Sequence, residues 1–180
     1  LAKDGLMVAV HYGRNREAAD EVVSKITSAG GQAFALPAEM SDVASITSMF
    51  AVLDRELTQR TGAARFDVLV NNAGTVIAKP TAEYTEQDFD AQFDLNVKGV
   101  FFTTQQAIPR LRDGGRIINL GTGLTRFSML PLGVYAATKG ALNVLTQHLA
   151  LELGPRNITV NTLAPGAIDT DLNANWLRTE

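Results

Sequence analysis

Cysteine is absent from the 180-residue chain, so neither a disulfide framework nor a thiolate site is available to it. This absence fits a reducing cytoplasm, where we expect the protein to reside. Long apolar runs are absent as well. The longest stretch without a charged residue, Ile26–Ala38, has thirteen residues and contains glycine and proline, whereas a membrane span needs about 20 apolar residues. We therefore expect no membrane partner. A targeting signal ahead of Leu1 is not excluded.

Concentrated positive charge is also lacking. The 16 lysine and arginine residues are scattered among 19 aspartate and glutamate residues, and the formal net charge is -3. Non-specific nucleic-acid binding requires a basic face, so we expect no nucleic-acid partner. The two histidines, His11 and His148, are too few and too far apart in the sequence to indicate a metal site. We interpret both as structural and expect no bound metal.

Short apolar runs rich in β-branched residues alternate with amphipathic helical patterns along the whole chain. The runs predict strands at Met7–His11, Ala33–Leu36, Asp67–Val70, Arg116–Leu120 and Thr159–Leu163. Their apolar cores are continuous, as is typical of parallel strands covered on both faces. The patterns between them predict helices over about 15–28, 41–57, 85–108 and 135–153. This alternation predicts a doubly wound α/β sheet with right-handed crossovers.

Several helix ends and buried faces can be predicted from local signals. Ser41 is the expected N-cap of the second helix, and Thr85 with Asp88 forms a capping-box-like start for the third. The apolar residues spaced to face inward are Ala19, Val22, Val23 and Ile26 in the first helix and Val43, Ile46, Phe50, Leu53 and Leu57 in the second.

The two ends of the sequence depart from this alternation. Residues Leu1–Gly5 resemble the last turn of a helix with a glycine stop, and a helix needs a strand in front of it in this architecture. At the other end, the chain reaches Glu180 soon after a strand and a loop. We therefore expect residues 1–180 to form a single dinucleotide-binding catalytic domain that is incomplete at both ends. It would lack its first βα unit and a C-terminal segment.

Tyr135 and Lys139 are four residues apart in a predicted helix, so their side chains share one face. A free tyrosine has a pKa near 10 and is a poor base at neutral pH. A positive charge at ~4 Å is worth about 4 kcal/mol at an effective dielectric constant of ~20, enough to lower that pKa by about three units. The same spacing occurs by chance in many helices, so alone it does not identify a catalytic site.

Small or polar residues directly follow three of the predicted strands. The segments that follow them are Asn71–Gly74, Gly121–Gly123 and Ala164–Gly166. The carboxyl ends of parallel strands meet at one edge of the sheet, where ligands bind in open α/β folds. Within the second segment, the Thr122 hydroxyl is suited to contact a substrate oxygen. Taken singly, Asn71–Gly74 is better explained as an ordinary turn, and Gly121–Gly123 has a simple loop as its alternative.

In their order and spacing, these pieces resemble the short-chain dehydrogenases/reductases of the single-domain kind, over essentially the whole chain. The matching residues are Asn71–Gly74, Asn96, Thr122, Tyr135, Lys139, Pro165, Gly166 and Thr170. The resemblance implies a Rossmann-type fold and a catalytic tetrad. In that tetrad Tyr135 exchanges a proton with a carbonyl or alcohol, Lys139 lowers the tyrosine pKa and binds the nicotinamide ribose, and Asn96 holds a water. Thr122 would complete the set.

The resemblance also implies a set of cofactor-binding residues. They are Tyr12, Gly13, Arg14 and Asn15 after the first predicted strand, Glu39 and Met40 near the adenine, Asn72, Ala73 and Gly74, the catalytic Tyr135 and Lys139, and Pro165, Gly166, Ile168 and Thr170 near the carboxamide. Members that prefer NAD end this strand with an acid that binds the ribose 2′-hydroxyl, but no acid occurs between Val10 and Glu17. Arg14 is suited to a 2′-phosphate instead, or is a solvated turn residue. NADP(H) is thus favoured over NAD(H).

Two features depart from the family pattern. Threonine stands at position 122, where the family usually has serine; the hydroxyl is kept, but a methyl group is added and the side chain is stiffer. We expect activity to survive in a narrower or slower site. In addition, no G-x-G-x-x-G phosphate loop occurs in the sequence. In the family that loop precedes the position of Leu1, so residues 1–180 alone should bind the cofactor poorly.

Three functions remain open. The first is an NADP(H)-dependent carbonyl reductase or alcohol dehydrogenase acting on a small molecule, and the second is a reductase of 3-oxoacyl thioesters. The third is a non-enzymatic dinucleotide sensor on the same fold. The residues Phe127, Met129, Leu130 and Leu132 either line an apolar substrate pocket or belong to the core. The resemblance further implies a homo-oligomer, a dimer or tetramer, formed through the helices over 96–108 and 135–153.

Overall fold

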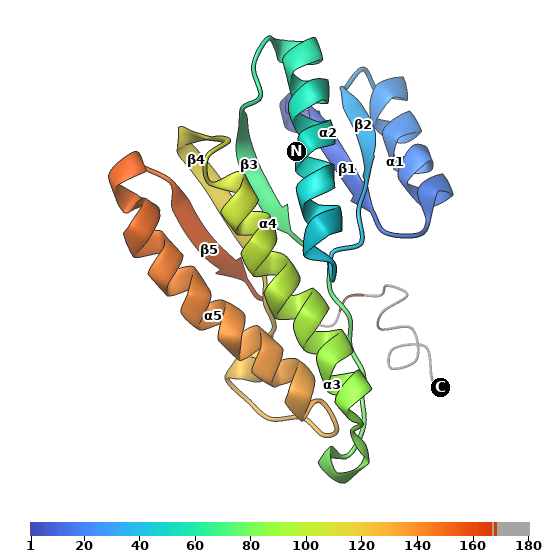
Figure 1. The fold of residues 1–180 in the computed structure, drawn as a ribbon, viewed down its shortest axis with the longest axis vertical. Helices are drawn as coiled ribbons and strands as arrows, with labels where there is room; N and C mark the ends of the chain where they lie inside the picture. The colour runs from blue at the N-terminus through green and yellow to red at the C-terminus, as the bar shows by residue number, and fades with distance from the viewer. Residues whose placement is uncertain (167, 169–180) are drawn as a thin grey trace. The chain divides into compact units, whose positions relative to one another are not determined.

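The chain folds into two compact units, Leu1–Arg65 and Phe66–Glu180. The computed structural model describes residues 1–166 and 168, and each unit is described by itself (Figure 1). Both units combine parallel strands with helices, which confirms the predicted α/β class. Among the described residues, no helix combines the length and the apolar character that crossing a membrane requires.

The first unit contains a pair of parallel strands and two helices. Strand β1 (Val8–Tyr12) pairs with β2 (Ala33–Pro37), and helix α1 (Arg16–Ser28) connects them. Helix α2 (Val43–Thr61) follows β2. The predicted Ser41 cap is wrong, because the Asp42 carboxylate accepts the Ala44 N–H and caps α2. The Ser41 hydroxyl instead donates to the Glu39 carboxylate at 2.9 Å.

The core of this unit lies along α2. Ile46, Phe50, Leu53 and Leu57 are buried as predicted. In α1, however, only Ala19 is buried, and Val22 is 42% exposed, so the inward placement of Val22 is wrong. At 3.6 residues per turn Val22 lies about 60° around the helix from Ala19, whereas Val23 and Ile26 lie closer to the Ala19 direction. Val22 therefore falls on the flank of the buried stripe.

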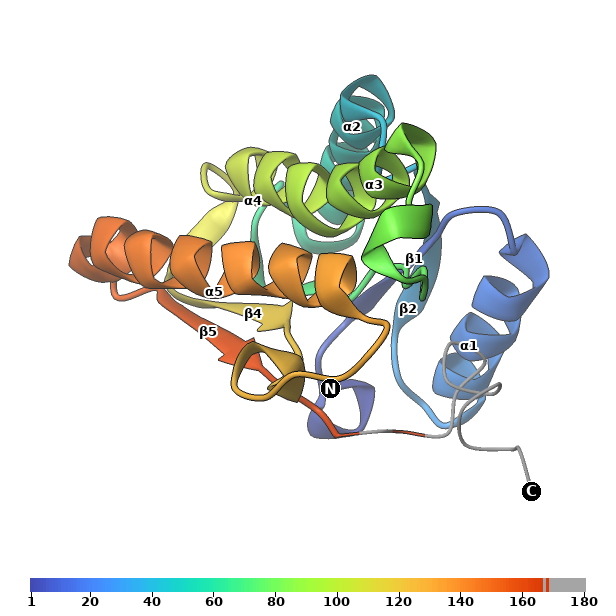
Figure 2. The ribbon, with the colours of Figure 1, turned by 90° about the horizontal axis from the view of Figure 1, so that it is seen from below.

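The second unit is a three-stranded parallel sheet in the order β3-β4-β5. Its strands are β3 (Phe66–Asn71), β4 (Leu111–Leu120) and β5 (Thr159–Leu163). A continuous helical segment joins β3 to β4, consisting of α3 (Glu86–Phe93), a π-helical turn (Asp94–Gly99) and α4 (Val100–Ala107). Helix α5 (Gly133–Leu153) joins β4 to β5. Figures 1 and 2 show α4 and α5 side by side over one face of this sheet.

Two local predictions for this unit have different outcomes. The capping box at the start of α3 is confirmed, with Thr85 and Asp88 bonded to each other's backbone N–H groups. Strand β4 begins at Leu111, five residues before the predicted start at Arg116. Leu111 is fully buried and pairs with Phe66, but the register shifts before Arg116. The charged and glycine residues within this irregular stretch conceal the strand in the sequence.

A buried polar network ties the carboxyl half of this sheet to its helices. Asn71 donates to Asn119 Oδ1 at 2.8 Å and to Thr104 Oγ1 at 3.1 Å. Asn119, which is 0% exposed, donates in turn to Thr146 Oγ1 at 2.9 Å. Thr162 adds a bond from β5 to Thr146 at 3.0 Å. The network links three strands and two helices directly beneath the strand ends, where the predicted site residues lie.

We predict that Asn119→Ala lowers the free energy of unfolding of the full-length protein by about 1–3 kcal/mol, because it removes buried partners of Asn71 and Thr146. Asn161→Ala, at an exposed asparagine on β5, is the matched control and should change stability by less than about 0.5 kcal/mol. Urea unfolding measures both. Equal effects of the two substitutions would contradict the role assigned to the network.

Candidate active site

Three loops leave the second unit at one edge, the carboxyl edge of its sheet. The ends of the strands pair as Asn71 with Asn119 and Leu120 with Leu163. The segments after β3, β4 and β5 therefore start side by side, as the sequence predicted. The Gly121 N–H donates to Leu163 O at 2.8 Å, and a Cβ at Gly121 would lie 2.4 Å from Thr162 Cγ2. Only glycine fits this close approach of the loop after β4 to the end of β5.

Lys139 is the buried cation of this edge. Its side chain rises from α5, is 4% exposed, and donates from Nζ to Leu120 O at 2.7 Å. The Nζ atom lies 5.8 Å from the centroid of the Tyr135 ring, so the two side chains share one helix face as expected. A Cβ at Gly74 would lie 3.6 Å from Nζ, which places the loop after β3 directly against the ammonium.

The acid–base properties of this pair differ from the sequence expectation. Burial lowers the pKa of Lys139 to about 8 and raises the pKa of Tyr135 above its ordinary value of 10. The net shift of the Tyr135 pKa in these surroundings is therefore upward. The Lys139 ammonium is bonded to the Leu120 carbonyl, and the cause of the upward shift at Tyr135 is the loss of water from around the phenol. Tyr135 is consequently a protonated phenol at neutral pH.

Asn96 lies within the π-helical turn and is 0% exposed. Its Oδ1 accepts the Thr75 N–H at 2.8 Å, and its Nδ2 donates to Thr75 O at 2.9 Å and to Thr138 Oγ1 at 3.1 Å. Both amide N–H groups are thus bonded to the protein, and the expected water stays a prediction. The sequence predicted a helix here but gave no sign of the π turn, a feature often found at functional sites.

Thr122 is positioned by a short 3-10 turn, Gly123–Thr125, that it caps. Its Oγ1 accepts the Leu124 N–H at 3.4 Å, which leaves the hydroxyl hydrogen able to donate to another group. Thr125 Oγ1 donates to Thr122 O at 3.2 Å and accepts from Asn143 Nδ2 at 3.1 Å. Helix α5, which carries Tyr135 and Lys139, therefore also holds the loop that carries Thr122. Sequence reasoning did not identify Thr125, Asn143 or Thr138.

The residues after this turn form an exposed apolar segment. Phe127 is 56% exposed, Met129 49% and Leu130 91%, so the alternative that these three belong to the core is wrong. Leu132 is buried and does belong to it. Phe127 packs against the loop, because a Cβ at Gly123 would lie 3.0 Å from its ring. Three exposed apolar side chains therefore lie in the segment that follows the Thr122 turn, and Phe127 is the one in contact with that turn.

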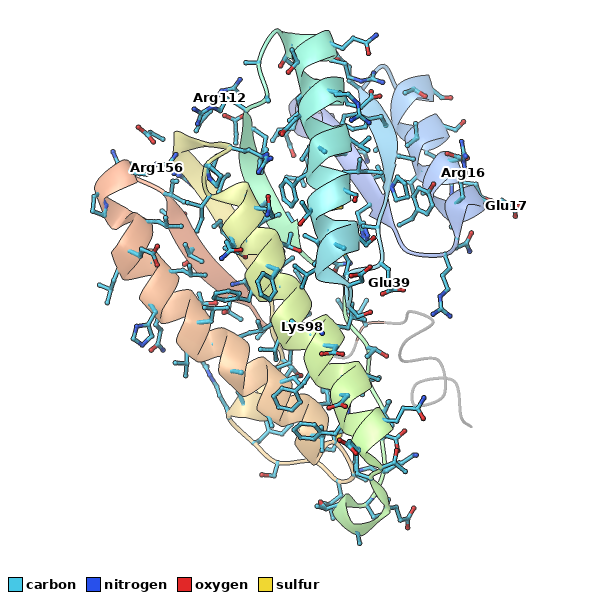
Figure 3. The ribbon with its side chains drawn as sticks, viewed as in Figure 1. Arg16, Glu17, Glu39, Lys98, Arg112 and Arg156 are labelled. Atoms are coloured by element: carbon cyan, nitrogen blue, oxygen red, sulfur yellow. The ribbon has the colours of Figure 1, made fainter. Side chains whose placement is uncertain are left out.

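In the first unit, the predicted adenosine-binding residues follow β1 and β2. Tyr12 is half-buried, Gly13 and Arg14 are exposed, and Asn15 caps α1 by accepting the Ala18 N–H at 3.0 Å. Figure 3 shows Glu39 in the segment between β2 and α2.

Glu39 is an ionised carboxylate at neutral pH. Hydrogen bonds from the Ser41 hydroxyl and the Ser41 N–H lower the pKa of Glu39, and the positive charge of Arg14 and the ring of His11 lower it further. Arg14 and Glu39 therefore act on each other at the carboxyl ends of β1 and β2.

The remaining predicted residues take varied positions. Met40 and Ala73 are half-buried, and Asn72 and Gly74 are exposed. Pro165 is half-buried, Gly166 is exposed and Ile168 is 54% exposed, whereas Thr170 lies outside the described residues. Within 1–166 and 168, no group of three histidine or acidic side chains is arranged to hold a metal ion.

The chain matches the family model for short chain dehydrogenases over residues 1–180. It is 40% identical over 171 residues to an uncharacterized oxidoreductase of Methylorubrum extorquens, covering 95% of this chain and 66% of that protein. It is 38% identical to a hydroxynaphthalene reductase-like protein, Arp2, of Metarhizium majus, covering 96% of this chain and 62% of the relative. The chain thus spans somewhat less than two thirds of the length of these curated relatives.

Solved structures agree with these matches. The angucycline C-6 ketoreductase LanV with bound NADP is 41% identical, with a TM-score of 0.91 over 96% of this chain and 69% of the other. A short chain dehydrogenase from Burkholderia cenocepacia in complex with NADP is 39% identical, with a TM-score of 0.88 over 98% and 71%. The parallel sheets, the loops at their carboxyl edge and the match along the full sequence lead to one conclusion: the chain belongs to the short chain dehydrogenase family.

Proposed function

We propose that the full-length protein is an NADP(H)-dependent oxidoreductase that interconverts a carbonyl compound and a secondary alcohol. The observation that carries this proposal is the buried Lys139 ammonium beside the Tyr135 phenol at the carboxyl edge of β3-β4-β5. Buried titratable pairs in such a position are typical of catalytic sites. The reductase names of several relatives, and the NADP in two of the similar structures, support the same reaction class.

The residues at this edge fit a nicotinamide ribose. Lys139 offers ammonium donors to ribose hydroxyls, and the bare Cα of Gly74 leaves room next to them, since a side chain there would meet both Asn96 Oδ1 and Lys139 Nζ within 3.6 Å. The bound dinucleotide supplies the hydride and, in its oxidised form, a positive charge. Asn72, Ala73, Pro165, Gly166 and Ile168 lie on the loops of the same edge and are proposed to line the cofactor.

Within this site the proton comes from Tyr135. As the carbonyl becomes an alkoxide, the phenol donates its proton to that oxygen, and the Lys139 ammonium stabilises the phenolate that remains. The Thr122 hydroxyl, whose hydrogen is not used by the turn it caps, donates a hydrogen bond to the same oxygen. Asn96 acts through the loop after β3. Because burial raises the pKa of Tyr135, the phenol carries at neutral pH the proton that carbonyl reduction requires.

We propose a bulky apolar ketone as the substrate class. Phe127, Met129 and Leu130 present exposed apolar surface next to the Thr122 loop, and aromatic ring systems suit such a wall. Relatives named for hydroxynaphthalene and angucycline substrates support this choice. A 3-oxoacyl thioester is the second substrate class that the sequence predicted, and it belongs in the same assay.

We further propose that NADP(H) is preferred to NAD(H). Arg14 follows β1 exposed to solvent, and no acidic side chain stands between the end of β1 and Glu17 to bind a ribose 2′-hydroxyl. A guanidinium at this position pairs with a 2′-phosphate. The homo-oligomer, a dimer or tetramer, stays a prediction, which is supported by exposed Phe101, Val144 and Leu151 on α4 and α5. The cytoplasmic location also stays a prediction.

We predict that Tyr135→Phe lowers kcat for ketone reduction by at least about 100-fold, because it removes the general acid. The dissociation constant for NADPH should change by less than about fivefold, since one hydroxyl is lost while the charged Lys139 contact to the ribose is kept. The value of kcat is measured from NADPH consumption over a panel of polycyclic ketones and 3-oxoacyl thioesters. The dissociation constant for NADPH is measured by fluorescence titration. Tyr84→Phe, which removes a hydroxyl bonded to Ile77 O and Gln92, is the control and should keep its turnover. Tight NADPH binding without turnover in the unmutated protein would support the sensor instead.

For the cofactor preference, Arg14→Ala should raise KM for NADPH roughly tenfold by removing charge-assisted hydrogen bonds to the 2′-phosphate. KM for NADH should be unchanged. The matched control is Arg16→Ala, two residues further on at the start of α1 (Figure 3), where the guanidinium pairs with Asp20 at 3.3 Å. Steady-state kinetics with both cofactors decides the question. Equal KM values for NADPH in Arg14→Ala and the unmutated protein would refute the assigned role.

A further inference from the structure

Thr138 lies on α5 between Tyr135 and Lys139 and is 0% exposed. Its hydroxyl donates to Tyr135 O at 2.7 Å and accepts from Asn96 Nδ2 at 3.1 Å. A helical threonine commonly bonds to the carbonyl three or four residues before it, with only a local effect. The second bond is different, because it connects α5 to a buried amide 42 residues away in the sequence.

The direction of these two bonds determines how the Asn96 amide is oriented. A threonine hydroxyl has one hydrogen, and that hydrogen is used on Tyr135 O. The oxygen can then only accept, so Asn96 must present Nδ2 to it. With Nδ2 facing Thr138, Oδ1 faces the Thr75 N–H and accepts it at 2.8 Å. If the Asn96 amide were flipped, its oxygen would face the lone pairs of the Thr138 hydroxyl. Its N–H groups would then face the Thr75 N–H.

The orientation of Asn96 in turn fixes the loop after β3. Both the N–H and the C=O of Thr75 are bonded to the Asn96 side chain. Thr75 follows Gly74, where a Cβ would lie 3.2 Å from Asn96 Oδ1 and 3.6 Å from Lys139 Nζ. The loop is therefore held at its distance from the ammonium by Asn96, and Thr138 supplies the contact from α5 that favours this direction of the amide.

We propose that Thr138 is a positioning residue of the active site, which orients the Asn96 amide and thereby seats the 72–75 loop against Lys139. Thr138 touches neither substrate nor cofactor in this role. Its effect on turnover rests on the proposed reductase function, whereas its effect on the loop does not. The hydroxyl is the group that matters, and serine can replace threonine in this function.

The test compares Thr138→Val, which keeps the shape and removes the hydroxyl, with Thr138→Ser, which keeps the hydroxyl. In the full-length protein, amide hydrogen exchange of peptides covering residues 72–78 should accelerate about fivefold or more in Thr138→Val and stay near the unmutated rate in Thr138→Ser. Exchange in α2 should be the same in all variants. With an active substrate, kcat/KM for NADPH should fall roughly 5- to 100-fold in Thr138→Val and less than about threefold in Thr138→Ser.

Thr103→Val is the matched control for removing a buried helical hydroxyl. Thr103 is 3% exposed on α4, and its hydroxyl has no hydrogen-bond partner among the described residues. This variant should leave both the exchange of 72–78 and the kinetics unchanged. If Thr138→Val does not fold, Thr138→Ala removes the hydroxyl without leaving a second methyl against the Asn96 amide and is used in its place.

Each outcome decides the proposal. The proposal is supported if Thr138→Val accelerates exchange only in residues 72–78 and Thr138→Ser does not accelerate it. Unchanged exchange in Thr138→Val, or acceleration by the same factor in every segment, overturns it, because the residue would then be dispensable or merely structural. If the unmutated protein reduces no carbonyl compound, the proposed function fails, and the exchange comparison alone still decides the role of Thr138.

Discussion

The second unit is organised around one buried ammonium. Removing a lysine side chain from water is costly unless its charge is hydrogen-bonded, and Lys139 meets that requirement through the Leu120 carbonyl at the end of β4. The contact fixes the start of α5 against the carboxyl edge of the sheet. The other groups of the site are then placed around it: the Tyr135 ring one turn away, the bare Cα of Gly74 and the Asn96 amide.

Burial moves the two titratable groups in opposite directions. The pKa of Lys139 falls to about 8, and that of Tyr135 rises from 10, because each charged form loses hydration. At neutral pH the phenol keeps its proton, and the lysine is mostly still an ammonium. Pairs of groups whose surroundings separate their pKa values reveal which one acts as the acid. In the proposed reaction, Tyr135 is the donor, and Lys139 supplies the charge that the resulting phenolate needs.

Much of this arrangement could be predicted from the sequence. The alternation of continuous apolar runs with helical periodicity gave the parallel sheets, and small or polar residues after three strands gave the loops of one edge. The pairing of Tyr135 with Lys139 followed from helical spacing alone. The Thr85 and Asp88 capping box was equally local, because both of its partners lie within one turn.

Other features depend on contacts that no local pattern encodes. Ser41 and Asp42 are both good caps, and only the reach of each side chain decides between them. The π turn at Asn96 leaves a helical sequence unchanged, and the start of β4 is concealed by glycine and charge. Thr125, Thr138 and Asn143 look like ordinary helix or loop residues until the fold brings them to Thr122 and Asn96. The direction of the tyrosine pKa shift also required the burial to be known.

The buried Lys139 ammonium, with its pKa near 8, controls the site. The most direct test is the pH dependence of kcat/KM for NADPH, measured with the full-length protein at saturating ketone from roughly pH 6 to 10. This quantity reports the ionisation of the enzyme before the cofactor binds. We predict a plateau at low pH and a tenfold fall per pH unit above about pH 8, as Lys139 loses its proton. A profile that stays flat through pH 10 would show that the ionisation of Lys139 does not control the site.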